Sequence, residues 1–289
     1  MPLFGAHTST AGGLHNALLA AQAHGMQSVQ LFTKNANQWN APDLTPEVVR
    51  LFRRTLRETG LRHTVAHDSY LINLASPDEA LFRRSVEAFV NEMRRAEELR
   101  LRYLVMHPGA HVDSGEEAGL ARVAAALDEV HARCANYRVR VLIETTAGQG
   151  SSLGHRFEHL ARILSLVAAP ERLGVCFDTC HVFAAGYTLA PLAEYRAKMR
   201  AFHETVGLRR LKVFHVNDSV RERGSRVDRH AHIGRGQIGL DAFRFLVNDP
   251  RFRSRPMILE TPKEDGDEKD MDAVNLAVLR GLQRQCDAA

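Results

Sequence analysis

The sequence predicts an α/β fold of the closed (β/α)8 TIM-barrel class, and two observations lead to this prediction. Short apolar runs alternate with amphipathic segments along all 289 residues, in eight successive strand–helix units. Six of these strands also end in a side chain that can bind a metal. The C-terminal ends of barrel strands converge on one face, whereas an open doubly wound sheet would spread them along a line. The strand ends therefore favour the barrel over the open sheet.

Each expected strand is a short apolar run bounded by polar or turn-forming residues. In chain order the eight runs are residues 2–7, 28–33, 62–67, 102–107, 138–144, 173–178, 211–216 and 255–260. No linker or low-complexity tract interrupts the alternation, and one barrel typically takes roughly 250 residues. We therefore expect a single domain over residues 1–289.

Three of the intervening helices are predicted from their starts and apolar faces. Thr45 and Pro46 open one helix, and Ser76, Pro77 and Glu79 offer an N-cap, a first-turn proline and a capping-box glutamate for another. Apolar residues at three-to-four spacing then mark the buried faces. They are Val48, Val49, Phe52 and Leu56 in the first helix, Phe82, Val86, Phe89, Met93 and Ala96 in the second, and Leu120, Val123, Leu127 and Val130 in a third.

The composition is that of a soluble globular protein, with 45% hydrophobic and 25% charged residues. No apolar run is long enough for a membrane span, and the first residues lack the pattern of a secretory signal. The cysteines form no C-x-x-C pair, so we expect reduced thiols in a cytoplasm; they are Cys134, Cys176, Cys180 and Cys286. The net charge of +4 permits a polyanionic partner, and 15 histidines favour metal chemistry.

The six metal-competent residues at strand ends are three histidines and three carboxylates. One such residue alone is more often a hydrogen-bonded structural group than a ligand. Six at the same topological position are hard to assign to chance, and this set suits zinc, manganese or iron. They are His67, His107, Glu144, Asp178, His215 and Glu260.

Three further candidate ligands lie in the expected connecting loops. His181 follows Asp178, and Asp228 and His230 form a D-x-H pair whose side chains leave an extended backbone on the same side. Nine candidate ligands would hold three cations, which suggests a highly charged substrate such as a phosphate.

These motifs resemble the endonuclease IV family, the zinc-dependent apurinic/apyrimidinic endonucleases of DNA base-excision repair. The resemblance runs in order through "GAHTSTAGGL", "LFTKNANQW", "HDSYLINL", "MHPGAH", "IETTAGQGSSLG", "HVNDS" and "ILETPK", and it is strongest in "DTCHVFAAGY" and "GSRVDRHAHIGRGQIG". It implies a TIM barrel that holds three divalent metals, zinc in the family, although manganese or iron would also fit. Glu144 would bridge two metals, and the other ligands would be His67 and His107 for the first metal, Asp178, His215 and Glu260 for the second, and His181, Asp228 and His230 for the third.

The resemblance also implies an activity. The phosphodiester 5′ to an abasic nucleotide would be hydrolysed by a hydroxide shared by two metals, with Glu144 and Glu260 as catalytic residues, leaving a 3′-hydroxyl and a 5′-deoxyribose phosphate. Blocked 3′ ends are further expected substrates. The implied protein is a cytoplasmic, nucleoid-associated monomer that binds double-stranded DNA and no membrane.

Expected DNA contacts lie in loops on the same barrel face. Tyr70 and Leu71 would wedge into the base stack at the lesion, and Asn37, Gln38 and Arg229 would contact the DNA nearby. Asn37 stands where the best-known family members carry an arginine. The basic loop with Arg221, Arg223 and Arg226 is consistent with phosphate contacts, although the first two could equally be solvated.

Two other functions remain open from the sequence. A metal-dependent sugar isomerase or epimerase could use a similar barrel, but such enzymes typically use two metals, and the third ligand set argues against one. A non-catalytic binder of damaged DNA would have no reason to keep nine costly polar residues.

Overall fold

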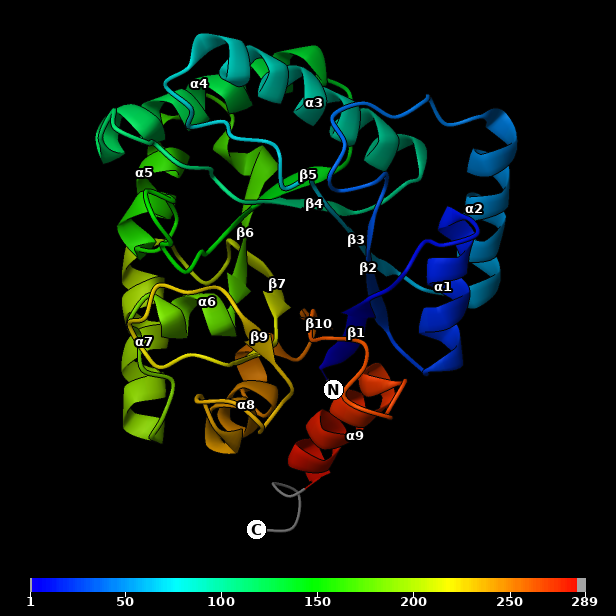
Figure 1. Cartoon of the computed structure of the whole chain (residues 1–289), viewed down its shortest axis with the longest axis vertical. Helices are drawn as coiled ribbons and strands as arrows, with labels where there is room; N and C mark the ends of the chain where they lie inside the picture. The colour runs from blue at the N-terminus through cyan, green and yellow to red at the C-terminus, as the bar shows by residue number, and fades with distance from the viewer. Residues whose placement is uncertain (1, 285–289) are drawn as a thin grey trace.

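The computed structural model describes residues 2–284, and its centre is a closed barrel of eight parallel strands (Figure 1). Each strand pairs with the next along the chain, and the last pairs with the first through Leu3↔Pro256 to Ala6↔Leu259. This arrangement confirms the predicted (β/α)8 class and excludes the open sheet. The strands are β1 (Leu3–His7), β2 (Ser28–Phe32), β3 (His63–His67), β4 (Tyr103–Met106), β5 (Arg140–Glu144), β6 (Leu173–Asp178), β7 (Leu211–His215) and β10 (Pro256–Leu259).

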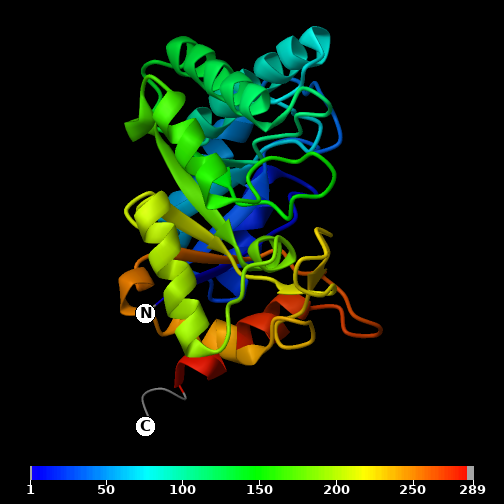
Figure 2. The same cartoon turned by 90° about the vertical axis from the view of Figure 1, so that its left-hand side faces the viewer.

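Helices surround the barrel, and the loops that follow the strands gather on one side of it (Figure 2). The helices of the outer ring are α1 (Leu14–Ala23), α2 (Pro46–Thr59), α3 (Glu79–Glu98), α4 (Glu116–Arg133), α5 (Phe157–Leu166), α7 (Leu192–Thr205), α8 (Leu240–Val247) and α9 (Met271–Arg284). The loop after β6 contains the short helix α6 (Thr179–Ala184), and the loop after β7 contains a small antiparallel pair, β8 (Asp218–Ser219) and β9 (His230–Ala231). Two 3-10 turns, Pro170–Arg172 and Pro250–Phe252, precede β6 and β10.

The helix starts agree only partly with the sequence prediction. Helix α2 begins at Pro46 with Thr45 as its N-cap, as expected, but Val48 of its predicted buried face is exposed. The N-cap prediction for α3 was wrong, because the cap is Asp78 and not Ser76. The Asp78 carboxylate accepts a hydrogen bond from the Leu81 N–H at 2.7 Å, whereas the Ser76 hydroxyl accepts one from the Asp78 N–H, which makes a turn before the helix.

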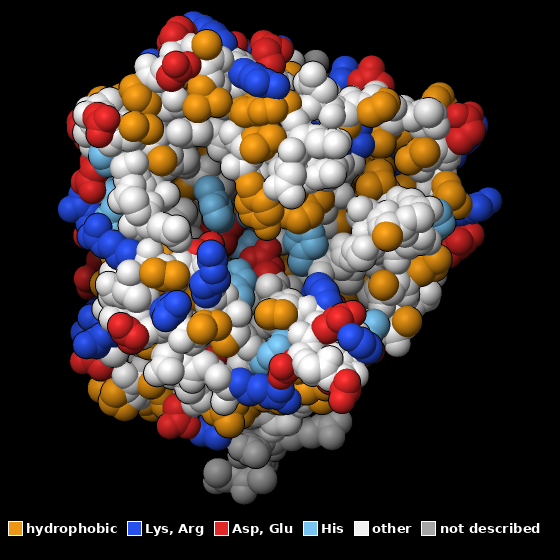
Figure 3. All heavy atoms as spheres, in the orientation of Figure 1, with side chains coloured by type: hydrophobic (Ala, Val, Ile, Leu, Met, Phe, Trp, Pro, Cys, Tyr) orange, Lys and Arg blue, Asp and Glu red, His pale blue; other side chains and the backbone are white. Residues whose placement is uncertain are grey.

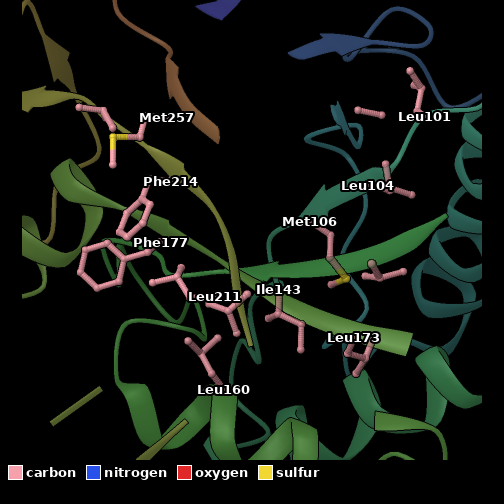
Figure 4. Close-up of a cluster of buried hydrophobic side chains, with 14 of the residues drawn as sticks. Leu101, Leu104, Met106, Ile143, Leu160, Leu173, Phe177, Leu211, Phe214 and Met257 are labelled. Carbon is pink, nitrogen blue, oxygen red and sulfur yellow. The ribbon is translucent and has the colours of Figure 1, made fainter. Parts of the chain in front are cut away.

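The hydrophobic core has two layers. The outer layer lies between strands and helices, where Phe177 and Phe214 pack near Ile143 and Leu160 (Figure 4). The inner layer fills the barrel with one or two side chains from most strands, which are Val65, Tyr103, Val105, Leu142, Cys176, Val213 and Ile258.

The inner layer fixes the direction of the strand-end side chains. Strand side chains alternate between the two faces with a period of two residues. The predicted ligands His67, His107, Glu144, Asp178, His215 and Glu260 each stand two positions after an inner-layer residue. They therefore point toward the barrel axis at its C-terminal end.

Cys134, Cys176 and Cys180 are free and buried, while Cys286 lies outside the described residues. None of the helices between residues 2 and 284 is both long and apolar enough to cross a membrane.

Candidate metal centre

The nine predicted ligands come together at the C-terminal end of the barrel. Figure 3 shows histidine and acidic side chains gathered in a hollow in the middle of this face. Glu144 lies at the centre and is fully buried. One of its oxygens lies 3.2 Å from His67 Nε2 and 3.3 Å from His107 Nε2, and the other lies 2.8 Å from His215 Nδ1. The carboxylate thus faces two groups of ligands at once, as a group shared by two cations would.

The electrostatics of the centre follow from this crowding. Burial alone would raise the pKa of Glu144, but His215 and His107 outweigh it and hold the pKa well below its ordinary value. Burial raises the pKa of Asp178, and His181 and His230 oppose that rise only in part. A cluster of buried carboxylates and imidazoles of this kind suits divalent cations, because cations compensate carboxylates that burial would otherwise protonate.

Four histidines are oriented by a hydrogen bond between one ring nitrogen, here called the outer one, and a carbonyl oxygen; for His181 this nitrogen also lies 3.3 Å from Glu144 Oε1. His67 Nδ1 lies 3.0 Å from the Asp68 carbonyl, and His181 Nδ1 lies 2.8 Å from the Thr145 carbonyl. The other two contacts join His230 Nδ1 to the Glu260 carbonyl at 3.2 Å and His215 Nε2 to Gln30 Oε1 at 2.8 Å. A carbonyl acceptor fixes the proton on the outer nitrogen, so the inner nitrogen keeps a lone pair for a metal.

The third group departs from the prediction in its secondary structure. His181 lies in α6 and not in a loop, and the Asp178 carboxylate caps this helix by accepting a bond from the His181 N–H at 2.7 Å. Asp228 and His230 approach from the β8–β9 segment, as the D-x-H pattern indicated. The two carboxylate oxygens of Asp228 lie 3.0 Å from His181 Nε2 and 3.3 Å from His230 Nε2.

Both of these ring nitrogens are buried and lack a hydrogen-bond partner of acceptable geometry within the described residues. Buried polar atoms without a partner are rare and need an explanation. A cation between His181, Asp228 and His230 would give each of these side chains a partner, so the geometry of the group fits a bound metal.

Two thiols stand close enough to the centre to be considered as ligands, and one of them, Cys180, lies beside Asp228 and His230. Cys176 lies beside Glu144 and His215. A cysteine binds metals as the thiolate, and burial raises the pKa of Cys176 to about 12. Its side chain is part of the inner core layer.

Sequence reasoning missed three side chains that support the ligands. Gln30 donates to Glu260 at 2.5 Å while its oxygen contacts His215, so it holds ligands from two strands. Asn217 donates to Asp178 at 2.7 Å and accepts from the Glu260 N–H at 2.7 Å. His7, at the end of β1, lies 3.7 Å from Glu260. His7 stands at the end of its strand, as the six predicted strand-end ligands do. This position in the sequence could have identified it as a residue of the site.

The loop that carries Asp228 and His230 is organised by one buried carboxylate. Asp218 Oδ1 accepts from the N–H groups of Ser219 and Ile238, at 2.8 and 2.9 Å, and Oδ2 accepts from those of Gly234 and Gly236, at 2.9 and 3.1 Å. Asp218 is fully buried. An added Cβ on Gly236 would lie 2.5 Å from Asp218 Oδ1, so the loop closes around the carboxylate only with glycine there.

A cleft of about 730 Å³ opens beside the metal centre. Tyr70 stands at its edge with 64% of its surface exposed, and its ring packs against Phe32 at 5.5 Å between centroids. The neighbouring Leu71 is half-buried. The far wall is the loop of residues 146–152, which carries Gly148 and Gly150.

The loop with the other predicted DNA contacts borders this face. Asn37 and Gln38 are exposed, and the loop is fixed from below by Lys34, which donates to the Gln38 carbonyl at 2.9 Å. Lys34 also pairs at 3.0 Å with Glu92, and both side chains are almost fully buried. Within the loop, the Asn35 side chain accepts a hydrogen bond from the Asn37 N–H at 2.9 Å.

The arginines of the basic loop are all exposed to solvent. Arg229 is exposed beside the third ligand group, and Arg221, Arg223 and Arg226 are exposed as well. The structure thus brings the nine candidate ligands together and leaves the predicted DNA contacts around them.

Comparison with known proteins agrees with this geometry. A model of the xylose isomerase-like TIM barrel family matches residues 18–281. "Probable endonuclease 4" from Chloroflexus aurantiacus is 51% identical over 282 residues, which cover 98% of both chains. The protein of the same name from Geobacter sulfurreducens is 48% identical, with 97% of this chain and 94% of that one covered.

Solved structures give the same result. Endonuclease IV from Thermus thermophilus superimposes with a TM-score of 0.86 at 36% identity, covering 98% of this chain and 100% of that one. A D-tagatose 3-epimerase-like protein superimposes with a TM-score of 0.73 at 20% identity, covering 99% and 100%, and shares the fold alone. With about half of its residues identical to the curated relatives over nearly its whole length, the chain belongs to the endonuclease IV family of xylose isomerase-like TIM barrels.

Proposed function

We propose that the protein is a metal-dependent endonuclease of DNA base-excision repair, which hydrolyses the phosphodiester 5′ to an abasic site. The observation that carries the proposal is the convergence of nine candidate ligand side chains in one hollow, where His181 Nε2 and His230 Nε2 are buried, face Asp228 and have no hydrogen-bond partner of acceptable geometry among the described residues. The products would be a 3′-hydroxyl and a 5′-deoxyribose phosphate, and removal of 3′-blocking groups would use the same centre.

The proposed ligand sets follow the three groups of side chains. Glu144 with His67 and His107 would hold the first cation. Glu144 with Asp178, His215 and Glu260 would hold the second, and His181, Asp228 and His230 the third. Zinc suits these nitrogen and oxygen donors, as do manganese and iron. When bound, such cations neutralise the phosphate charge and lower the pKa of water, which allows hydrolysis near neutral pH.

The chain's own residues would supply positioning and selection. Gln30 and Asn217 keep Glu260 and Asp178 in place, so the centre is preorganised before the substrate arrives. Tyr70 and Leu71 would enter the base stack at the lesion, where unstacking costs least. Asn37, Gln38 and Arg229 would contact the DNA around them. We take residues 1–289 as one endonuclease domain that acts as a monomer in the cytoplasm, at the nucleoid.

The rival activity on the same barrel is sugar isomerisation or epimerisation. The epimerase-like structure shares only the fold at 20% identity. The third group, built on Asp228 and His230, gives this chain a ligand set that a two-metal sugar enzyme does not need. We therefore prefer the phosphodiesterase.

The test is a duplex with one abasic site, labelled at either end and incubated with the protein before and after treatment with a chelator. A single cut 5′ to the site that leaves a 3′-hydroxyl, disappears with chelator and returns with zinc is the expected result. A full rate of cutting in the presence of chelator, or no cutting by the metal-replete protein, would overturn the proposal.

A further inference from the structure

A rim of positive charge surrounds the end of the barrel opposite the metal centre. Five strands begin at or next to a basic residue, just as their other ends carry the ligands. We call these residues the basal rim, and they are Arg62 before β3, Arg102 before β4, Arg140 at the start of β5, Lys212 as the second residue of β7, and Arg255 before β10. This end of the barrel is the side of Figure 2 on which the N-terminus is labelled.

The basal rim lacks the counter-charges found elsewhere on the molecule. Among residues 2–284, no carboxylate oxygen lies within 4.0 Å of a charged nitrogen of any of the five. The repulsion is visible at Lys212, because burial together with Arg255 and Arg140 lowers the pKa of its ammonium. Elsewhere several arginines are paired with carboxylates, as in Arg133 with Glu87 at 2.6 Å and Arg83 with Glu79 at 2.8 Å.

An arginine-lined groove continues from the basal rim between α2 and α3. It consists of two adjoining clefts of about 820 and 690 Å³, which share Arg53 and Arg100. Together they are lined by eight arginines and three glutamates, and two of these arginines, Arg94 and Arg54, also pair with Asp43 and Glu58, which leaves an excess of three positive charges. The groove therefore keeps an excess of positive charge, and Arg102 belongs to both the groove and the basal rim.

Arg100 has an unusual backbone for an arginine. It follows the C-cap Leu99 of α3 in the left-handed region, at φ 59°, where glycine is the usual residue. Its side chain is exposed at the junction of the two clefts. A strained conformation that places a guanidinium in a cationic groove indicates use of that guanidinium.

We propose that the basal rim and the groove form a second DNA-binding surface, which contacts the phosphate backbone of a segment other than the one at the metal centre. The cations come from five strands and two helices, so they are spread too widely for one phosphate and suit an extended polyanion. The choice of DNA rests on the proposed function. Because the two surfaces lie at opposite ends of the barrel, one protein molecule would bind two DNA segments at once and could transfer from one segment to the other.

The test compares two variants that each remove two exposed arginines. Arg102→Gln/Arg140→Gln changes the basal rim, and Arg196→Gln/Arg200→Gln is the matched control on α7, where both arginines are also exposed. Affinity for an undamaged duplex is measured between about 50 and 200 mM salt. For the rim variant, the slope of log K against log salt should become shallower by about 0.9 per lost phosphate contact, which is about 1.8 in all. The control should keep the wild-type slope.

If the two variants had equal slopes of log K against log salt, the proposed second surface would be wrong. This holds whether both slopes differ from the wild-type slope or both equal it. Nicking of a short abasic duplex should stay at the wild-type rate in both variants, and a wild-type protein that failed to nick would refute the proposed endonuclease while leaving the slope comparison valid. Arg100→Gly gives an independent check. It should weaken binding of undamaged DNA with the thermal midpoint unchanged or raised, and unchanged binding would show that Arg100 is not part of the surface.

Discussion

Replacing Asp218 with asparagine should destabilise the loop that holds Asp228 and His230. The carboxylate accepts four backbone hydrogen bonds, two on each oxygen, and it is fully buried. An asparagine amide has the same shape but only one acceptor oxygen. Two of the four N–H groups would therefore face an NH2 group and lose their acceptor.

The size of the effect follows from those two lost bonds. A hydrogen bond to a charged group contributes about 1.5–3 kcal/mol, and a buried donor without a partner has a cost of the same order. Asp218→Asn should accordingly lower the free energy of unfolding by roughly 3–6 kcal/mol. This is a large part of the roughly 5–15 kcal/mol that stabilises a typical domain.

Urea unfolding followed by circular dichroism measures the loss, and elemental analysis measures the metals retained. The variant should be destabilised by the stated amount and should lose the third metal before the other two, because only Asp228 and His230 depend on this loop. Asp113→Asn is the control, since Asp113 is exposed and should change stability by less than about 0.5 kcal/mol. An Asp218→Asn protein with wild-type stability and full metal content would refute the reasoning.

Four further substitutions probe other parts of the molecule. Glu144→Gln should nearly abolish nicking while circular dichroism reports an intact barrel, because an amide is a poor bridge between cations; near-wild-type nicking by the metal-replete variant would contradict the shared carboxylate. His181→Ala should cut turnover sharply yet spare the metals of the other two groups, so simultaneous loss of all metals would disprove separate groups. Asn37→Arg should tighten binding to an abasic duplex and steepen its salt dependence by about one phosphate contact, with turnover at saturation unchanged; an unchanged slope would place residue 37 away from the DNA. Lys34→Met should lower the free energy of unfolding by about 3–5 kcal/mol, because it leaves Glu92 as an unpaired buried charge, and Lys34→Met/Glu92→Met should recover part of this loss. A double variant less stable than the single one would contradict that explanation.

The barrel and the positions of the candidate ligands at the strand ends could be predicted because both depend on local periodicity. An inner-layer residue such as Leu142 fixes the face on which Glu144 must lie, two positions later. The supporting residues could not be found in this way. Gln30 reads as an interruption of an apolar strand, and its partners His215 and Glu260 are 185 and 230 residues away. Only closure of the barrel brings them together.

The errors in local structure have equally physical causes. Ser76 and Asp78 are both good helix caps two residues apart, and the sequence alone does not say which of them the helix uses. His181 was expected in a loop because α6 has only six residues, too few to display a helical period. The exposure of Val48 shows that an apolar residue in the first turn of a helix need not belong to its buried face.

The most direct test of the metal centre is metal content measured together with cleavage. Protein stripped by chelator is titrated with zinc, and the ions bound per chain and the nicking of an abasic duplex are measured at each step. The nine converging ligands predict three bound ions and recovery of cleavage as they bind. Binding of fewer ions at saturation, or cleavage that is already complete in the stripped protein, would contradict the assignment of this centre as the site of hydrolysis.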